Sequence, residues 1–347
     1  MRKAKLWSLI GFSQLLVSFV SVNAQANSNE TYYTTNPGII KTTRSVIYYK
    51  DADKHHVMRH VAKGHFAKIN HIILKDGKRP MLKTNTGAYL TANKRFVSKT
   101  QGYQNPKRYY QVNYTQIKPY GKVGYTVKRN YEGIKVWKIM HRMGTYNGYN
   151  KYNNATYFAV KSFQHKHHLK ATGNVNEATW TKMGFSRHSW KSIDSYVAPL
   201  GANAWHGRSA HIEAMIKQAQ RYMGKPYLVG SSTSPAYGTD CSGLAMQALY
   251  AGGINPAPIS SINHAHPGNE WNSRNLWASK KFKHVAYSHR ERGDLVFYYQ
   301  PGTRTIWHIA IYLGHNRVIE SWPPRTMIQP IRNGQRSNVA GIVRPFV

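Results

Sequence analysis

The chain has a single cysteine, Cys241, in the stretch GTDCSGLAMQ, where a thiol could serve as a nucleophile. The preceding loop is rich in Ser, Thr, Gly and Pro, and an apolar helical run, LAMQALYAGG, follows. Asp240 or Thr239 could cap that helix, which would place the sulfur in its first turn. Backbone amides and the helix dipole favour an anion there, so we expect a lowered pKa for the thiol.

A buried structural cysteine is the alternative, because unpaired cysteines are common in protein cores. The immediate neighbours Asp240, Ser242 and Gly243 are polar or small, whereas a core cysteine usually lies among apolar residues. The sequence therefore favours a reactive thiol.

A thiolate nucleophile needs a base within hydrogen-bonding reach, usually histidine, and a third group that orients the base. The segments RGDLVFYY and WHIAIYLG both read as strands, and the second contains His308. Strand alternation predicts an apolar face formed by Ile309, Ile311 and Leu313. His308 then points away from that face.

Glu320, in the next predicted strand RVIESW, is the candidate orienting group. With a three-residue turn at 314–316, Ala310 pairs with Glu320. Glu320 is then a diagonal neighbour of His308 on the same face, with backbones about 7 to 8 Å apart, a gap that a glutamate side chain can bridge. A two-residue turn would put the two side chains on opposite faces.

Three blocks within residues 209–347 resemble, in order, the signature blocks of NlpC-type cysteine peptidases of the bacterial cell wall. These blocks are PYLVGSSTSPAYGTDCSGL, GDLVFYY and HIAIYLG. The resemblance implies an α+β, papain-like domain in which the helix bearing the cysteine packs on an antiparallel sheet. It also implies that Cys241 is the nucleophile and His308 the general base.

The third polar residue of the family falls at Glu320, where the commonest pattern has a second histidine. A carboxylate at this position can still fix the tautomer of His308 and stabilise the imidazolium. By the same resemblance, Tyr227 assists the oxyanion or the substrate carbonyl. Asp240 and Ser242 match positions that line the cleft for the stem peptide.

The activity implied is hydrolysis of a peptidoglycan stem peptide, at the bond between γ-D-glutamate and the following diamino acid. One alternative is a wall-binding or structural protein with an inactive catalytic domain. Another is a related Cys and His enzyme of the CHAP type, an N-acetylmuramoyl-L-alanine amidase. These three interpretations remain open at the level of sequence.

Residues 124–185 show a helical apolar pattern in the segments EGIKVWKIMHRMG, ATYFAVKSFQHKHHL and NEATWTKMG. The first predicted helix ends at Gly144 and the third begins after Asn176. This stretch resembles the three-helix peptidoglycan-binding module, with matching motifs at 159–164, 169–175 and 179–180. The resemblance implies that the module binds peptidoglycan glycan.

Residues 40–97 read as short strands, with a hairpin signal at Asp76-Gly77. They resemble the small basic β-barrel modules of Gram-positive surface proteins, of the SH3-like and surface-layer type, most clearly in GAYLTANKRFV. We expect a module that associates with the wall. An ordinary β-rich domain with solubilising cations is the alternative. Residues 98–123 and 186–208 are expected to be linkers.

The chain is strongly basic, with 49 Lys and Arg against 13 Asp and Glu and a formal net charge of +36. Residues 1–204 contain 33 of these cations and 7 of the acids, so the basic excess is mainly N-terminal. Such a balance predicts a polyanionic partner. For an exported chain this indicates anionic wall polymers such as teichoic acids rather than nucleic acid.

Export is predicted from the first 26 residues, where Arg2, Lys3 and Lys5 precede an apolar run that ends in small residues. This is the pattern of a secretory signal peptide, and the run is too short for a membrane anchor. We expect a secreted, wall-associated protein without stable membrane insertion. One cysteine forms no internal disulfide, so core packing must hold the fold.

Two histidine-rich stretches, QHKHH and KHHVMRH, raise the question of a metal site. A zinc site needs ligands that converge in a closed shell, often with a thiolate or carboxylate. Neither stretch offers such a closed shell nearby. We therefore expect solvated histidines, no metal and no other cofactor.

Overall fold

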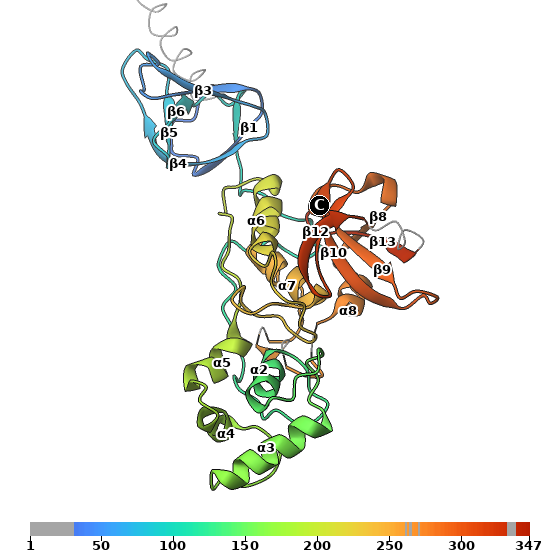
Figure 1. The fold of residues 1–347 in the computed structure, drawn as a ribbon. Helices are drawn as coiled ribbons and strands as arrows, with labels where there is room; N and C mark the ends of the chain where they lie inside the picture. The colour runs from blue at the N-terminus through green and yellow to red at the C-terminus, as the bar shows by residue number, and fades with distance from the viewer. Residues whose placement is uncertain (1–30, 261, 264–265, 270, 332–337) are drawn as a thin grey trace, which may run out of the picture. The chain divides into compact units, whose positions relative to one another are not determined.

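The computed structural model describes residues 31–260, 262–263, 266–269, 271–331 and 338–347. The chain divides into two compact units, Met1–Gly102 with Trp205–Gly207, and Tyr103–Ala204 with Arg208–Val347 (Figure 1). The predicted signal peptide lies outside the described residues. Within the described ranges, no helix combines the length and the apolar character needed to cross a membrane.

The first unit contains seven antiparallel strands in the order β3-β2-β6-β5-β4-β1-β7. Its core includes the fully buried side chains of Ile40, Leu82 and Leu90. The short strands expected in this segment are therefore present. They are β1 (Ile39–Thr42), β2 (Val46–Tyr49), β3 (Val57–Val61), β4 (Phe66–Ile73), β5 (Met81–Thr84), β6 (Tyr89–Thr91) and β7 (Val97–Lys99).

The second unit begins with the helical module, which contains α2 (Ile134–Met143), α3 (Asn154–Lys166) and α4 (Glu177–Lys182) as predicted. The Asn176 side chain caps α4 by accepting a hydrogen bond from the Thr179 N–H at 2.9 Å. A fourth helix, α5 (Arg187–Ser195), lies in the segment predicted as a linker. That prediction was wrong for α5, because Trp190 and Ile193 are buried in the core of the helical module.

A buried ion pair connects α2 and α5. The Nζ atom of Lys135 lies 2.5 Å from Oδ2 of Asp194, and both side chains are almost fully buried. The ammonium group also lies 3.8 Å from the ring centre of Trp190 and 4.3 Å from that of Tyr125. Burial lowers the pKa of Lys135 and raises the pKa of Asp194, while their mutual attraction opposes both shifts. The pair therefore holds α5 to the module.

The described residues of the rest of the second unit form three α-helices and a six-stranded antiparallel sheet in the order β12-β11-β10-β9-β13-β8 (Figure 1). Helix α7 packs on α6 and on strands β10 and β11. The α+β class, with the cysteine-bearing helix on an antiparallel sheet, is confirmed. The elements are α6 (Arg208–Gln220), α7 (Cys241–Ala251), α8 (Ser273–Ala278), β8 (Lys283–Val285), β9 (Leu295–Tyr299), β10 (Ile306–Gly314), β11 (Arg317–Trp322), β12 (Arg325–Pro330) and β13 (Val339–Arg344).

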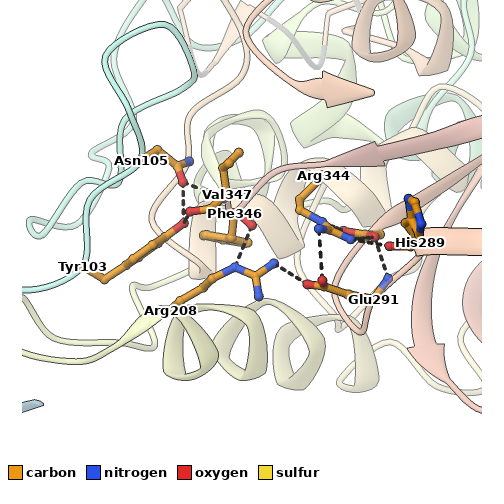
Figure 2. Close-up of polar contacts among 9 residues, drawn as sticks. Tyr103, Asn105, Arg208, His289, Glu291, Arg344, Phe346 and Val347 are labelled. Carbon is orange, nitrogen blue, oxygen red and sulfur yellow. Dashed lines mark hydrogen bonds and ion pairs between the residues drawn. The ribbon is translucent and has the colours of Figure 1, made fainter. Parts of the chain in front are cut away.

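Residues 103–123, predicted to be a linker, are bound to this unit. Val112 is buried in its core, and the Tyr110 hydroxyl donates to the Pro256 carbonyl oxygen at 2.6 Å. Figure 2 shows the same segment at the C-terminal residues, where the Tyr103 hydroxyl donates to the Val347 carbonyl oxygen at 2.9 Å. The segment thus completes the core.

Helix α6 also contacts the C-terminal residues, through Arg208 (Figure 2). Arg208 donates from Nε to the Phe346 carbonyl oxygen at 2.8 Å and forms an ion pair with Glu291 at 3.0 Å. Glu291 also pairs with Arg344 on β13 at 3.1 Å. Arg208 is the first residue of α6, so these contacts fix the start of that helix to the C-terminal residues.

Asp194→Ala should lower the free energy of unfolding of the second unit by about 3–5 kcal/mol, because it leaves the Lys135 ammonium buried without its partner. Denaturant unfolding followed by tryptophan fluorescence measures this change. Arg187→Ala is the control, because Arg187 forms an exposed pair with Glu177 and should contribute less than about 1 kcal/mol. Equal stability of wild type and Asp194→Ala would contradict the role of the pair.

Candidate active site

The nucleophile candidate is the first residue of α7, and Asp240 is the cap of that helix. Oδ1 of Asp240 accepts hydrogen bonds from the Gly243 N–H at 2.7 Å and from the Ser242 hydroxyl at 3.0 Å. Cys241 is only 7% exposed. Of the two residues predicted to cap α7, Asp240 is the one that does so. Its carboxylate holds the first turn of the helix, which carries the Cys241 sulfur.

The loop before the cysteine packs directly on this turn. The Gly230 N–H donates to Oδ2 of Asp240 at 2.9 Å, and the Asp240 N–H donates to the Ser231 carbonyl oxygen at 3.1 Å. A Cβ atom on Gly243 would lie 1.9 Å from that same carbonyl oxygen. A glycine is therefore required at position 243 for the loop to approach the helix.

The environment of Cys241 raises the pKa of its thiol. Burial is the largest cause and the Asp240 carboxylate adds to it, whereas the backbone N–H groups of Ile309 and Ser242 lower the pKa. The predicted net lowering was therefore wrong, because burial beside a carboxylate outweighs the helix terminus. A thiol of this kind needs a base to take its proton.

His308, on β10, is the base that the sequence predicted, and it is buried beside Glu320 of β11. The His308 Nε2 atom lies 2.5 Å from Oε2 of Glu320. The next residue, Ile309, places its backbone N–H within hydrogen-bonding reach of the Cys241 sulfur. Nε2 of the imidazole therefore faces Glu320, and Nδ1 is its other nitrogen.

Neighbouring side chains fix the orientation of this pair. The imidazole of His308 packs edge-on against the Trp322 ring, with ring centres 4.7 Å apart, and lies 5.5 Å from the Tyr298 ring. Gln329, on β12, donates from Nε2 to Oε1 of Glu320. Glu320 is fully buried, so this amide holds the carboxylate in place from the side opposite the histidine.

The hairpin between β10 and β11 has the expected register, but its turn differs from the predicted one. Ile311 pairs with Ile319, as predicted. The predicted three-residue turn was wrong, because only residues 315–316 separate the paired ends and a β-bulge at Leu313 supplies the missing residue. Because the bulge adds one residue to β10, the side chains alternate as they would with a three-residue turn. The imidazole and the carboxylate therefore lie on the same face.

Tyr227, which the resemblance assigned to the oxyanion or the substrate carbonyl, lies near Cys241 and Asp240. Its backbone N–H donates to the Pro324 carbonyl oxygen at 2.9 Å, and Tyr227 forms an isolated parallel bridge with Thr239. Burial raises the pKa of Tyr227, and negative charge on Cys241 and Asp240 raises it further. The phenol therefore stays protonated and is available as a donor.

Two residues of the helical module also lie near Tyr227, and nothing in their local sequence predicted this. Glu132 and Tyr149 both contribute to the raised pKa of Tyr227. The Tyr149 hydroxyl donates to Oε1 of Glu132 at 3.3 Å. Their proximity to Tyr227, like that of Gln329 to Glu320, depends on tertiary packing, which no local sequence motif predicts.

Comparison with protein families assigns two of these segments. Residues 224–339 match the NlpC/P60 family. The chain carries an NlpC/P60 domain. Residues 136–183 match the putative peptidoglycan binding domain, so the helical module is assigned as predicted. Residues 32–97 match only a domain of unknown function, DUF5776, and the SH3-like and surface-layer resemblance stays a prediction.

Curated relatives match parts of the chain. The bifunctional muramidase/DL-endopeptidase CwlT of Bacillus subtilis is 31% identical over 134 residues, which are 38% of this chain and 34% of CwlT. The murein DD-endopeptidase MepH of Escherichia coli is 29% identical over 164 residues, 47% of this chain and 55% of MepH. The chain thus spans about a third and about half of these relatives' lengths.

Among solved structures, the peptidoglycan hydrolase RipB of Mycobacterium tuberculosis is 24% identical, with a TM-score of 0.30. The match covers 40% of this chain and 67% of that chain. The P60 domain of the M. avium paratuberculosis antigen MAP1272c is 20% identical, with the same TM-score, and is covered to 96%.

Iodoacetamide should alkylate Cys241 at neutral pH at least about tenfold faster in wild type than in His308→Ala. Without the imidazole the thiol keeps its raised pKa, so the rate should increase only at a pH above the ordinary cysteine value of about 8.5. Intact-protein mass spectrometry measures the rate, and Glu320→Gln should give an intermediate value. Equal rates at pH 7 in wild type and His308→Ala would exclude His308 as the base.

Proposed function

We propose that the protein is a peptidoglycan hydrolase that cleaves a stem-peptide amide bond with Cys241, His308 and Glu320. The observation that carries this proposal is the buried contact between Nε2 of His308 and Glu320. Ile309, which follows His308 on β10, has its backbone N–H within hydrogen-bonding reach of the Cys241 sulfur. Nucleophile, base and orienting carboxylate are the three groups that a cysteine peptidase needs. The family assignment of this segment supports the same reaction class.

In the proposed reaction, Nδ1 of His308 takes the thiol proton as the sulfur of Cys241 attacks the amide carbonyl carbon. The tetrahedral intermediate expels the amine, which receives the proton from the imidazolium, and a thioester remains on the sulfur. A water molecule, deprotonated by His308, then attacks the thioester and releases the acid and the free thiol. Glu320 stabilises the imidazolium in both steps.

Tyr227 is the proposed donor to the oxyanion. Its raised pKa keeps the phenol protonated, and a donor placed where negative charge develops lowers the barrier most. Asp240 and Ser242 are proposed to line the cleft for the stem peptide. Their mutual hydrogen bond at 3.0 Å fixes both side chains next to the nucleophile.

We propose the bond between γ-D-glutamate and the diamino acid as the scissile bond. The relative CwlT is named as a DL-endopeptidase, which agrees with a bond between a D and an L residue. MepH is named as a DD-endopeptidase, so a cross-link between two D-centres is the second candidate. The two relatives differ in this respect, and the products of digestion distinguish the two bonds.

The test is a digest of purified sacculi with the mature protein and with Cys241→Ala, followed by mass spectrometry of the soluble products. We expect wild type to release stem-peptide fragments whose new amino terminus is the diamino acid, and Cys241→Ala to release none. Conversion of cross-linked dimers to intact monomers would instead indicate DD-endopeptidase activity, and free lactyl groups an amidase. Equal release by both proteins would contradict the thiol mechanism.

The wall is the proposed location, with secretion directed by the predicted signal peptide. Between residues 31 and 102 there are 14 Lys and Arg but only three acidic residues. Two of the three, Asp51 and Asp53, are already bound to neighbouring histidine and lysine side chains. We propose that this first unit binds anionic wall polymers such as teichoic acids.

Binding of the full chain to teichoic-acid-containing walls should weaken steeply as salt rises from 50 to 500 mM, because ions screen contacts between exposed charges. Co-sedimentation with walls measures this binding. Walls stripped of teichoic acid are the control and should retain less protein at low salt. Binding that is independent of salt, or equal on stripped walls, would contradict the electrostatic proposal.

A further inference from the structure

The helical module contacts the loop that precedes the nucleophile along much of its length. We call residues 228–239 the nucleophile loop. Leu228 is buried in the core of the module. Further along, the Thr233 hydroxyl donates to the Ile193 carbonyl oxygen of α5 at 3.0 Å, and the Tyr237 ring lies 5.4 Å from Nζ of Lys138. The module therefore holds the loop at its start, middle and end.

The closest polar contact comes from Asn150, a buried residue between α2 and α3. Its Nδ2 atom donates to the Val229 carbonyl oxygen at 2.8 Å, and its Oδ1 atom accepts from the Val229 N–H at 3.1 Å. A single amide thus satisfies both backbone groups of Val229, as a neighbouring strand would. Such a paired contact fixes the position of the loop and the direction of its backbone.

Two glycines allow the backbones to meet beside this contact. A Cβ atom on Gly133 would lie 3.0 Å from the Gly230 carbonyl oxygen, and a Cβ atom on Gly230 would lie 3.1 Å from Cβ of Glu132. Both glycines have positive φ angles, 98° and 69°. The pocket lined by these segments has a volume of only about 10 Å³, so the loop has little room to shift.

A short series of hydrogen bonds connects the residue after Val229 with the helix that carries Cys241. The next residue, Gly230, donates its N–H to Oδ2 of Asp240 at 2.9 Å. The other oxygen of Asp240 caps α7, whose first residue is Cys241. Asn150 is thus connected to Cys241 through two consecutive loop residues, Val229 and Gly230, and one carboxylate.

We propose that Asn150 is a positioning residue for Cys241, and that the helical module is part of the catalytic machinery as well as a peptidoglycan-binding element. The inference rests on the proposed role of Cys241 as nucleophile. Without the Asn150 amide, Gly230 is free to leave Asp240 and the cap of α7 weakens. The amides that favour the thiolate then lose their alignment with the sulfur.

If the module only tethered the enzyme to the wall, changes at Asn150 would affect digestion of insoluble sacculi but not of small soluble substrates. Positioning predicts the opposite, an effect on every substrate and on the thiol itself. A soluble stem peptide without glycan therefore separates the two roles. Alkylation of Cys241 needs no substrate at all, so it stays informative even if the proposed peptide activity is wrong.

The experiment compares full-length Asn150→Ala with wild type. We expect alkylation by iodoacetamide at pH 7 to be at least about fivefold slower, and kcat on the soluble peptide to fall by about 10- to 100-fold with KM nearly unchanged. Asn154→Ala is the matched control, because Asn154 is exposed in the same module and accepts from Arg129 at 3.0 Å. It should behave as wild type.

Asn150→Asp keeps the acceptor for the Val229 N–H but replaces the donor by a carboxylate oxygen that faces the Val229 carbonyl oxygen, so it should slow both rates as Asn150→Ala does. It also replaces Asn150→Ala if that variant does not fold, as judged by thermal unfolding. A folded Asn150→Ala or Asn150→Asp protein with wild-type alkylation and wild-type kcat on the soluble peptide would overturn the proposal. Slower digestion of sacculi alone would show a tether and would overturn it equally.

Discussion

The carboxylate of Asp240 is the contact on which the catalytic unit depends. One oxygen holds the first turn of α7 through Gly243 and Ser242, and the other holds the nucleophile loop through Gly230. Burial raises the pKa of Asp240 while these donors lower it. The same carboxylate also raises the pKa of the adjacent Cys241 thiol. The carboxylate that orders the loop and the start of α7 therefore also makes the thiol less acidic. A thiol with a raised pKa needs a well-placed base to take its proton.

Local signals in the sequence predicted the parts of the site that local chemistry determines. The Asp240 cap follows from residue type at a helix start. The shared face of His308 and Glu320 was predicted from strand alternation, but the β-bulge at Leu313, rather than a three-residue turn, produces it. Helix α5, the Gln329 contact and the docking of the module on the loop could not be predicted, because they depend on tertiary packing. The direction of the thiol pKa was missed for the same reason, since burial is a property of the fold.

The distribution of charge follows from these internal requirements. Besides Asp240, the buried carboxylates among the described residues are Asp194, Asp294 and Glu320, and the one buried Lys or Arg is Lys135. Each of these acids accepts hydrogen bonds from a specific partner in the core or the site. Negative charge is thus used inside the fold, which leaves the surface richer in cations than the formal net charge indicates.

The bulge at Leu313 affects what can be inferred about this site from the sequences of related chains. It sets the parity of a strand, so the relation between His308 and Glu320 depends on the number of residues in the hairpin as well as on their identity. Loss or gain of one residue there would turn the carboxylate to the opposite face while Cys241, His308 and Glu320 all remained in the sequence. A relative could therefore retain cysteine, histidine and glutamate in the correct order and still lack a working triad.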